Sequence, residues 1–453
     1  MADSDAMPRP SLPRPLVAAI ALPPLVLAAL LAAWGVDLPY WDQFALVPHL
    51  AQQASGDFQL GNLWLPHNEH RLFVPQAIML TLASWSDWNV LWELWFQYGL
   101  AVATLVLLLS LLRDASGKAV SCSAVLIFSL MVFSPVQWRN WIWGWQIQIF
   151  LVVLSTVATV WLLARVQTSW LRVATAATAA TVGSLSFANG LLIWPLALPL
   201  VVFGRPSKSF GDRRPDWAQA GIWLVTGAAV WAFYLHGFVP SVDHGPTDEG
   251  LWRQFLHFGA YVVLYLAAPG LRFHDQAALW IGFVLVAAAM SAMVWAGLQA
   301  ALRRDAEAVR KGLPWWSLSA FAVASAAITA LGRLDLGIGQ ALSSRYVTIG
   351  NLFWLGLIGW LVSSRLPARR APSRAMPISG FVVVGLLLIN AAHGVYHFQR
   401  DSQARSDLRR QILDAESVED MGSVPLQLIH PSPEEAASHL TTLRQLELGP
   451  YRR

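Results

Sequence analysis

The residues best suited to chemistry lie in one polar stretch soon after the first apolar run. Positions 67–71 read His-Asn-Glu-His-Arg in a chain that is 56% hydrophobic and only 13% charged, and Asp37 and Asp42 precede them. A carboxylate can take a proton from a hydroxyl group, and the planar guanidinium of an arginine suits a phosphate. The stretch therefore has the residue types for transferring a group from a phosphate to a hydroxyl.

Three carboxylates in this stretch are candidates for the general base. Asp42 lies about eight residues beyond Trp34, where the first apolar run ends, so we expect it near a membrane surface and place it first. Asp37 has another reading, as the cap of the segment after the run. Glu69, between two histidines, could act as the base or as a metal ligand. All three stay open at this stage.

The same polar run contains residue types that bind divalent metals. Imidazole and carboxylate groups such as those of His67, Glu69 and His70 suit Mn or Zn, but their spacing has no HExxH pattern. We therefore expect a hydrogen-bonded polar turn and assign neither a metal ligand nor a required cofactor. A bound divalent cation, Mg or Mn, is the alternative.

Several outer arginines lie in polar or aromatic motifs, which indicates anion binding. The motifs are Trp-Arg-Asn-Trp at 138–141 and Gly-Gln-Ala-Leu-Ser-Ser-Arg-Tyr at 339–346; Arg333 also faces outward, without an assigned role. The other reading is that these arginines pair with outer aspartates or lie near lipid headgroups. Most tryptophans fit the aromatic belt of a membrane protein, but Trp41, Trp138 and Trp141 could stack on a sugar. The residues predicted to bind substrate are His67, Asn68, His70, Arg71, Trp138, Arg139, Trp141, Asn189, Gln340, Ser344, Arg345 and Tyr346.

The composition sets the class of protein that positions these side chains. A mean hydropathy of +0.48 and repeated apolar runs of about 18 or more residues indicate an all-α, polytopic membrane protein. The net charge of +4 does not indicate nucleic acid as a partner, because Lys and Arg lie in short loops between apolar runs. Cys122 is the single cysteine, which excludes an intrachain disulfide and a CxxC site.

The basic loops predict the topology. Clusters at 9–14, 113–118, 165–172, 205–214, 303–311 and 365–374 fall on one side, which is the cytoplasm by the positive-inside rule. About eleven transmembrane helices result, with a cytoplasmic N-terminus and an outer C-terminus. The predicted spans are 16–34, 90–112, 119–136, 146–164, 171–187, 190–203, 217–235, 277–301, 314–331, 347–362 and 378–392.

One apolar segment is left out of this count. Counting 255–268 as a span would reverse the charge rule for everything after it, so we predict a re-entrant or interfacial helix there. The alternative is that 255–268 spans and 190–203 does not.

Two polar regions remain outside the membrane. The first outer loop, 35–89, contains Pro and Gly breaks between short helices, one of them near 45–54. A tail of about 60 residues, 394–453, is too small and polar to have a large core of its own. We predict a transmembrane catalytic domain at 1–393 and a small outer C-terminal segment at 394–453.

This arrangement resembles the GT-C superfamily of polytopic membrane glycosyltransferases. The resemblance lies in an acidic motif just after the first span, Tyr-Trp-Asp at 40–42, the long first outer loop, and the motifs at 67–71, 186–190 and 343–346. These motifs look like those of uncharacterised bacterial members. It implies inverting transfer from a polyprenyl-phosphate sugar, with Asp42 as the catalytic aspartate and Arg345 at the phosphate. The chain departs from the family's acidic pair, because Gln43 follows Asp42, which keeps Asp37 and Glu69 open as bases.

The resulting hypothesis is a glycosyltransferase of the bacterial inner membrane. It would use a polyprenyl-phosphate sugar donor on the periplasmic side and a cell-envelope glycan, lipid or protein as acceptor, with membrane lipids around it. One alternative is an O-antigen polymerase, and another is a non-enzymatic transporter or flippase of lipid-linked glycans. A transporter needs ionisable groups at mid-membrane depth; the predicted spans contain few, chiefly Glu93, which favours chemistry at the surface.

Overall fold

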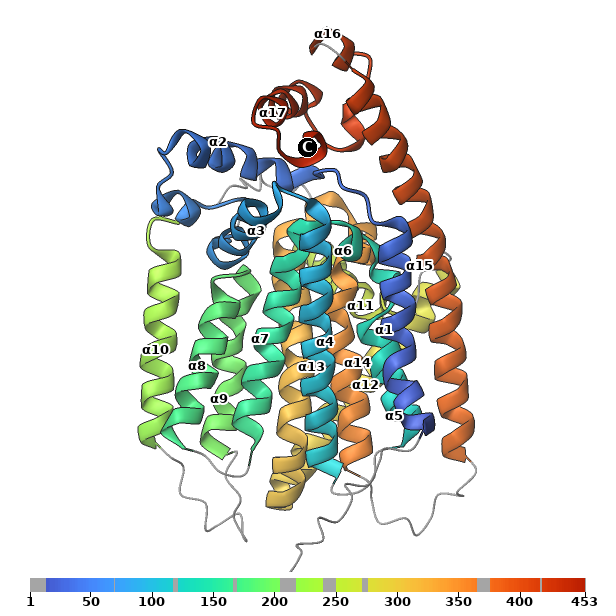
Figure 1. The fold of residues 1–453 in the computed structure, drawn as a ribbon. Coiled ribbons are helices and arrows are strands. Elements are labelled where there is room, and N and C mark those ends of the chain that lie inside the picture. The colour runs from blue at the N-terminus through green and yellow to red at the C-terminus, as the bar shows by residue number, and fades with distance from the viewer. Residues whose placement is uncertain are drawn as a thin grey trace, which may run out of the picture.

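The computed structural model describes residues 14–68, 70–116, 121–165, 169–203, 217–238, 250–270, 276–364, 375–415 and 418–452. Within these ranges the regular structure is helical, and strand-like pairing is limited to an isolated bridge between His67 and His70. Most helices stand side by side in one bundle (Figure 1). This agrees with the predicted all-α fold.

Nine helical segments of the described chain are long and apolar enough to cross a membrane, as expected of a multi-pass membrane protein. Their apolar side chains pack in one continuous core. The helices that form these segments are α1 (Arg14–Trp34), α4 (Val90–Ser116), α5 (Cys122–Val132) with α6 (Trp138–Ile142), α7 (Ile147–Ala164), α10 (Trp217–Leu235), α12 (Gln276–Leu302), α13 (Ala306–Arg333), α14 (Val347–Ser363) and α15 (Ala375–Asp414).

Two further predicted spans are short helices. The helix α8 (Trp170–Ser184) has 15 residues, and α9 (Ile193–Phe203) has 11. A 3-10 turn, η5 (Ala188–Leu192), connects them. Both stand beside α7 and α10 in the bundle (Figure 1), although each is shorter than the roughly 20 residues that usually cross a bilayer.

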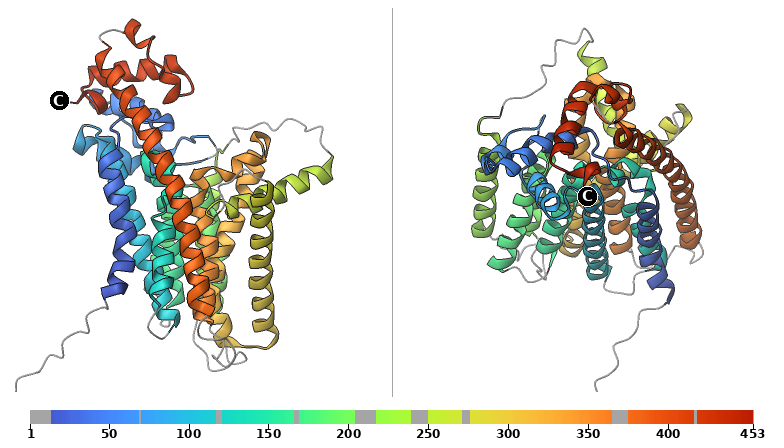
Figure 2. Two further views of the ribbon diagram at one scale, coloured as in Figure 1. Left: turned by 90° about the vertical axis from the view of Figure 1, so that its right-hand side faces the viewer. Right: turned by 45° about the horizontal axis from the view of Figure 1, so that its top comes forward.

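The segment predicted to be interfacial does lie differently from the others. The helix α11 (Leu251–Ala267) runs steeply across the direction of the long helices and projects from the bundle near the end that carries the first loop (Figure 2). Its first turns expose Leu251, Trp252 and Phe255, whereas Tyr261 and Tyr265 are buried in the bundle. An apolar free end and a buried inner end suit a helix at a membrane interface.

The first loop folds over one end of the bundle. Its elements are η1 (Trp41–Leu46), α2 (Val47–Ser55), η2 (Leu60–Trp64) and α3 (Phe73–Ser86), so the helix expected near 45–54 is present as η1 and α2. Gly56 ends α2 in the left-handed conformation (φ 81°), which glycine adopts without a steric cost.

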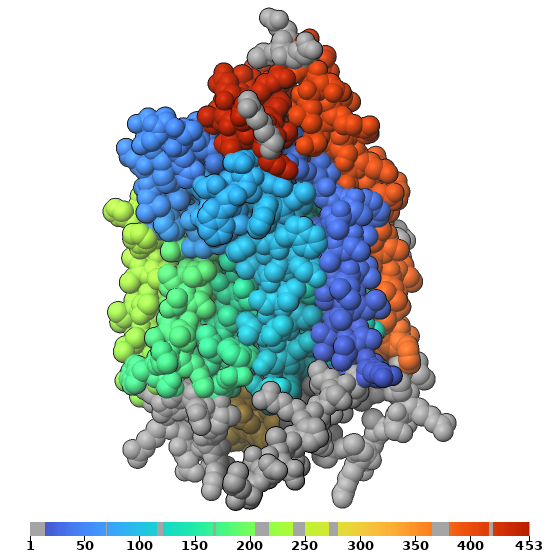
Figure 3. Space-filling model, in the orientation of Figure 1, coloured from blue at the N-terminus to red at the C-terminus, as the bar shows by residue number. Residues whose placement is uncertain are grey.

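The C-terminal segment covers the same end. The helix α15 continues beyond the bundle and leads to α16 (Val418–Met421), η9 (Leu426–Leu428), α17 (Pro433–Gln445) and η10 (Gly449–Tyr451). Together with the first loop these elements form one continuous cap in the space-filling view (Figure 3). Apolar residues of both regions, such as Leu46, Leu50, Leu440 and Leu443, belong to one buried cluster. The cap is therefore a single packed unit.

Candidate functional site

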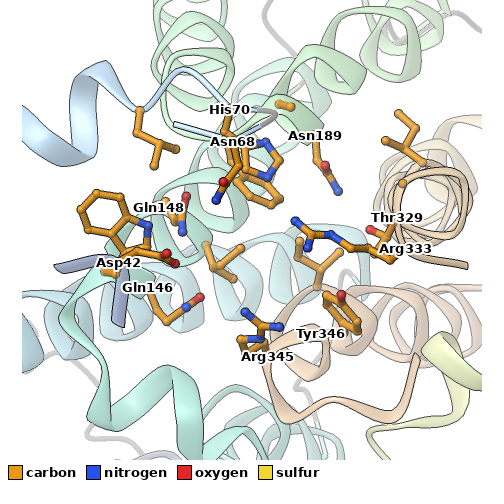
Figure 4. Close-up of a pocket in the computed structure, with 18 of the residues that line it drawn as sticks. Asp42, Asn68, His70, Gln146, Gln148, Asn189, Thr329, Arg333, Arg345 and Tyr346 are labelled. Carbon is orange, nitrogen blue, oxygen red and sulfur yellow. The ribbon is translucent and has the colours of Figure 1, made fainter. Parts of the chain in front are cut away.

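A cavity of about 390 Å³ lies where the cap meets the bundle. Its walls come from the first loop, from the chain between α6 and α7, from η5, from the end of α13 and from η8 (Ser344–Tyr346). Figure 4 shows polar side chains from all of these elements around one open space. Of the predicted site residues, seven line it: Asp42, His67, Asn68, His70, Asn189, Arg345 and Tyr346.

Among the described residues of the cavity wall, Asp42 is the one with a carboxylate side chain. It lies in η1, and its Oδ1 is 3.4 Å from Nε2 of His67, with about a third of the side chain (31%) still exposed. From beneath, Gln43 supports η1, because its amide oxygen accepts from the Tyr40 N–H (3.1 Å) and its amide nitrogen donates to Glu93 (2.6 Å). Asp42 is thus on a supported element and can reach a ligand.

His67 and His70 close a tight turn beside Asp42. The N–H of each donates to the carbonyl of the other, at 2.8 and 3.0 Å, and Asn68 has a positive φ of 50°, which asparagine tolerates in hairpin turns. Burial, followed by the charge of Arg333, lowers the pKa of His70 from 6.5 to about 3. The imidazole of His70 is therefore neutral. Glu69, the third candidate base, lies outside the described residues.

Two arginines enter the cavity from other walls. Figure 4 shows the guanidinium of Arg333, from the end of α13, and that of Arg345, from η8, reaching into the open space, with Asp42 across from Arg333. The Nε of Arg345 is buried and has no hydrogen-bond partner among the described residues. Its backbone is fixed, because Asn140 donates to the Arg345 carbonyl (3.0 Å) and to Thr348 (2.6 Å).

The remaining polar wall is uncharged. Buried Trp143, Gln148 and Asn189 each present a side-chain nitrogen or oxygen that has no partner within the described chain, as does Nδ1 of His70. Buried polar groups are normally hydrogen-bonded, so several unmet groups around one cavity indicate a polar ligand. Amides and aromatic rings of this kind suit the hydroxyl groups and ring of a sugar.

Asp37 lies away from the cavity and holds the fold together. Its Oδ1 accepts from the N–H of Val90 (2.8 Å) at the start of α4, and its Oδ2 pairs with Arg452. A carboxylate at a helix N-terminus is stabilising. Both carboxylate oxygens of Asp37 are therefore engaged away from the cavity, and the helix that it caps is α4 and not the segment directly after the first span, as its other reading had it.

Arg71 is likewise not positioned to bind a phosphate. It is buried, and it donates to the carbonyls of Trp64 (2.7 Å), Tyr234 (2.8 Å) and His236 (2.6 Å), the last two at the end of α10. Helix C-termini leave carbonyls without intrahelical partners. The side chain therefore satisfies these carbonyls and does not line the cavity.

The other predicted residues do not line the cavity. Trp141 is fully buried, packs on Phe133 and Phe150, and belongs to the bundle core, which corrects its predicted contact with sugar. Trp138 stacks on His397 of α15, and Arg139 lies over the Trp138 ring. Gln340 and Ser344 do not line the cavity either.

Metal ligation has limited support in the described chain. No three His, Cys, Asp or Glu side chains gather there as a metal-ligand group. Asp42 and His67 are close, but two ligands do not define a Mg or Mn site. We therefore route no step through a cation.

Several residues of the cavity wall were not predicted from the sequence. Arg333 was counted as an outer arginine but given no role, and Trp143, Trp145, Gln146 and Gln148 were not selected. The signal available in the sequence was the pair of glutamines, Gln146 and Gln148, at the start of an apolar run. Burying a polar side chain is costly unless it has a hydrogen-bond partner.

No protein-family model, curated protein or solved structure matches this chain. The functional argument therefore depends on the geometry of the cavity.

Proposed function

We propose that the chain is a polytopic membrane glycosyltransferase of GT-C type. It transfers one sugar from a polyprenyl-phosphate donor to a cell-envelope glycan, lipid or protein, at the membrane face that carries the first loop. The observation that carries this proposal is the cavity in which the Asp42 carboxylate faces the guanidinium groups of Arg333 and Arg345.

The proposed reaction uses each of these groups once. The acceptor hydroxyl oxygen attacks the anomeric carbon, and the bond from that carbon to the phosphate oxygen breaks, with its electron pair going to the phosphate. Asp42 takes the hydroxyl proton as general base. Arg333 and Arg345 stabilise the negative charge that grows on the leaving polyprenyl phosphate. Attack opposite the leaving group inverts the sugar.

The net charge of the described cavity wall is opposite and equal to that of a donor with a single phosphate. Among the described residues of the wall, two guanidiniums and one carboxylate sum to one positive charge, which matches a phosphodiester donor. After transfer the proton resides on Asp42 and the released phosphate monoester carries up to two negative charges, opposite two arginines. Balance before and after the reaction supports this donor class.

The size of the cavity also supports a small donor. Ligand sites usually measure roughly 300–1,000 Å³, so about 390 Å³ is at the small end. It suits one sugar phosphate better than the diphosphate-linked oligosaccharide of a polymerase.

The finer topology is part of the same proposal. We propose that α8 and α9 cross together with the nine long segments, giving eleven spans in a bacterial inner membrane, a cytoplasmic N-terminus and a periplasmic C-terminus. The described arginines at the ends of α4 and α7, Arg113 and Arg165, lie at the end of the bundle opposite the cap, as the positive-inside rule requires. Reporter fusions at Arg113 and after Tyr451 test the two orientations.

The test of the reaction is release of polyprenyl phosphate from a panel of labelled polyprenyl-phosphate sugars, with membrane extract as the source of acceptor. Asp42→Asn is compared with Asp57→Asn, a matched change at an exposed aspartate of the same loop. We expect transfer by the wild type and Asp57→Asn but not by a folded Asp42→Asn protein. Equal transfer by both variants contradicts Asp42 as the base. Binding of every donor without turnover contradicts the enzyme and favours a transporter.

A further inference from the structure

The residue before Asp42 has an unusual backbone. Trp41 has a φ of 50°, a left-handed conformation that residues with a Cβ rarely adopt. The residue is 39% exposed, and its ring lies 6.1 Å from that of Tyr40. Its N–H donates to the carbonyl of Ile429 at 2.7 Å. The direction of the chain into Asp42 therefore depends on a contact from the other end of the sequence.

A second contact from the same region holds η1 from above. Phe44 is fully buried, with the ring of His430 edge-on at 5.5 Å and that of His439 stacked at 6.0 Å. The Gln43–Glu93 hydrogen bond holds η1 from below. The element that carries Asp42 is thus fixed between the bundle and residues 426–452, which we call the C-terminal clamp.

The clamp also binds both ends of the first loop. Arg452 pairs with Asp37 at the loop's start, and the N–H of Gly449 donates to the Asp87 carbonyl (2.9 Å) at its end. Figure 1 shows α17 and the C-terminus over this loop. None of the described residues of the clamp lines the cavity, so its contacts act on the site through the first loop.

We infer that the C-terminal clamp is a positioning element for Asp42, holding Trp41 in its left-handed conformation so that the carboxylate faces the cavity. The inference rests on the proposed function for its catalytic meaning. Its structural content, that the clamp sets the geometry of η1, holds independently of any activity.

The test compares two arginines of the C-terminal region, each of which pairs with an aspartate. Arg452→Gln removes the pair with Asp37, whereas the matched control Arg410→Gln removes an exposed pair with Asp407 that does not touch the loop. Hydrogen–deuterium exchange of residues 40–46 is measured on the full-length protein in lipid nanodiscs. We expect faster exchange in Arg452→Gln only. Exchange equal to the control's overturns the inference.

Kinetics then separate positioning from a general loss of structure. In Arg452→Gln we expect kcat to fall about tenfold or more, because small displacements of a catalytic group are costly. The donor KM should stay unchanged, since Arg333 and Arg345 are not held by the clamp. Adding Trp41→Gly, which permits the same φ without strain, should restore part of kcat. A raised KM with unchanged kcat contradicts the inference.

Failure of the proposed function is recognised separately. If the wild type transfers no sugar from any donor, the glycosyltransferase assignment fails. The exchange comparison still decides whether the clamp positions η1.

Discussion

The cavity and the anchors of the first loop contain the same charged residue types, yet their hydrogen bonding differs. At the anchors, Asp37 accepts from Val90 and pairs with Arg452, and Arg71 donates to three backbone carbonyls. In the cavity, Asp42 has His67 at 3.4 Å, and the Nε of Arg345 has no partner in the described chain.

This difference separates residues that hold the fold from residues that can act on a ligand. Charges in direct contact with the backbone are matched in the folded protein, and removing one leaves its partners unsatisfied. In the cavity, Asp42 is partly exposed and the Nε of Arg345 has no partner in the described chain, so a ligand can still bind them. Changes in the cavity should therefore act mainly on transfer and donor binding, and changes at the anchors mainly on stability.

The largest expected effects come from substitutions of the two aspartates, Asp42 and Asp37. Asp42→Asn should reduce sugar transfer by roughly 10²- to 10⁴-fold, the usual contribution of a general base, with little change in melting temperature. Asp37→Asn should lower the melting temperature, because the charge opposite Arg452 is lost, and should reduce transfer in the folded fraction about tenfold, as expected for Arg452→Gln. Transfer assays and tryptophan-fluorescence melting measure both. The opposite pattern would reverse the roles assigned to the two regions.

The next largest effects should come from substitutions of the arginines. Arg345→Gln and Arg333→Gln should each weaken donor binding or transfer by roughly 10- to 100-fold, the value of one charged hydrogen bond. Arg71→Gln should lower stability and leave the donor KM unchanged, because its partners are backbone carbonyls. Binding of polyprenyl phosphate to the purified variants is the direct measurement. A loss of binding in folded Arg71→Gln equal to that in Arg345→Gln is incompatible with this division.

A pH effect should come from His70. Its pKa is lowered to about 3, so between pH 6.5 and 3 the unfolded chain binds a proton there that the folded protein does not. Stability should then fall as the pH drops below 6.5, by at most about 1.4 kcal/mol per pH unit from this group. Replacing His70 by Gln should flatten the melting-temperature profile between pH 6.5 and 5. An unchanged profile would mean that His70 is not held neutral.

The smallest effect should come from two neighbouring tryptophans. Trp143→Phe removes an indole N–H from the cavity wall and should raise the donor KM by roughly two- to tenfold. Trp141→Phe alters only the core, where its N–H donates to Ser134 (3.0 Å), so it should lower stability without a change in KM. A larger KM change in Trp141→Phe would move the sugar site toward the core.

The fold was predictable where local sequence determines structure. Apolar runs identified the long helices, and the charge pattern singled out the segment that became α11. The lengths of α8 and α9 were not predictable, because α8 ends and α9 begins at the close packing around Gly190, where the backbone of Gly183 leaves no room for a Cβ. Hydropathy reports no such contact.

The site was predictable to the extent that its residues are neighbours in sequence. Asp42, His67 and His70 were found because they lie in one polar stretch. Arg71 and Arg345 have similar sequence surroundings, and what distinguishes them is distant: Arg71 meets carbonyls 163 and 165 residues away in the chain. To predict Arg333 as a wall residue, one would have to know that α13 ends at the cavity. Only the structure could therefore show which of these arginines already have hydrogen-bond partners within the protein.

The most direct measurement is an electron cryomicroscopy structure of Asp42→Asn in lipid nanodiscs with a bound polyprenyl-phosphate sugar. The phosphate should lie between Arg333 and Arg345, with the anomeric carbon facing the side chain at position 42. A donor phosphate bound outside this cavity, or a sugar turned away from position 42, would contradict the assignment of the cavity as the catalytic site.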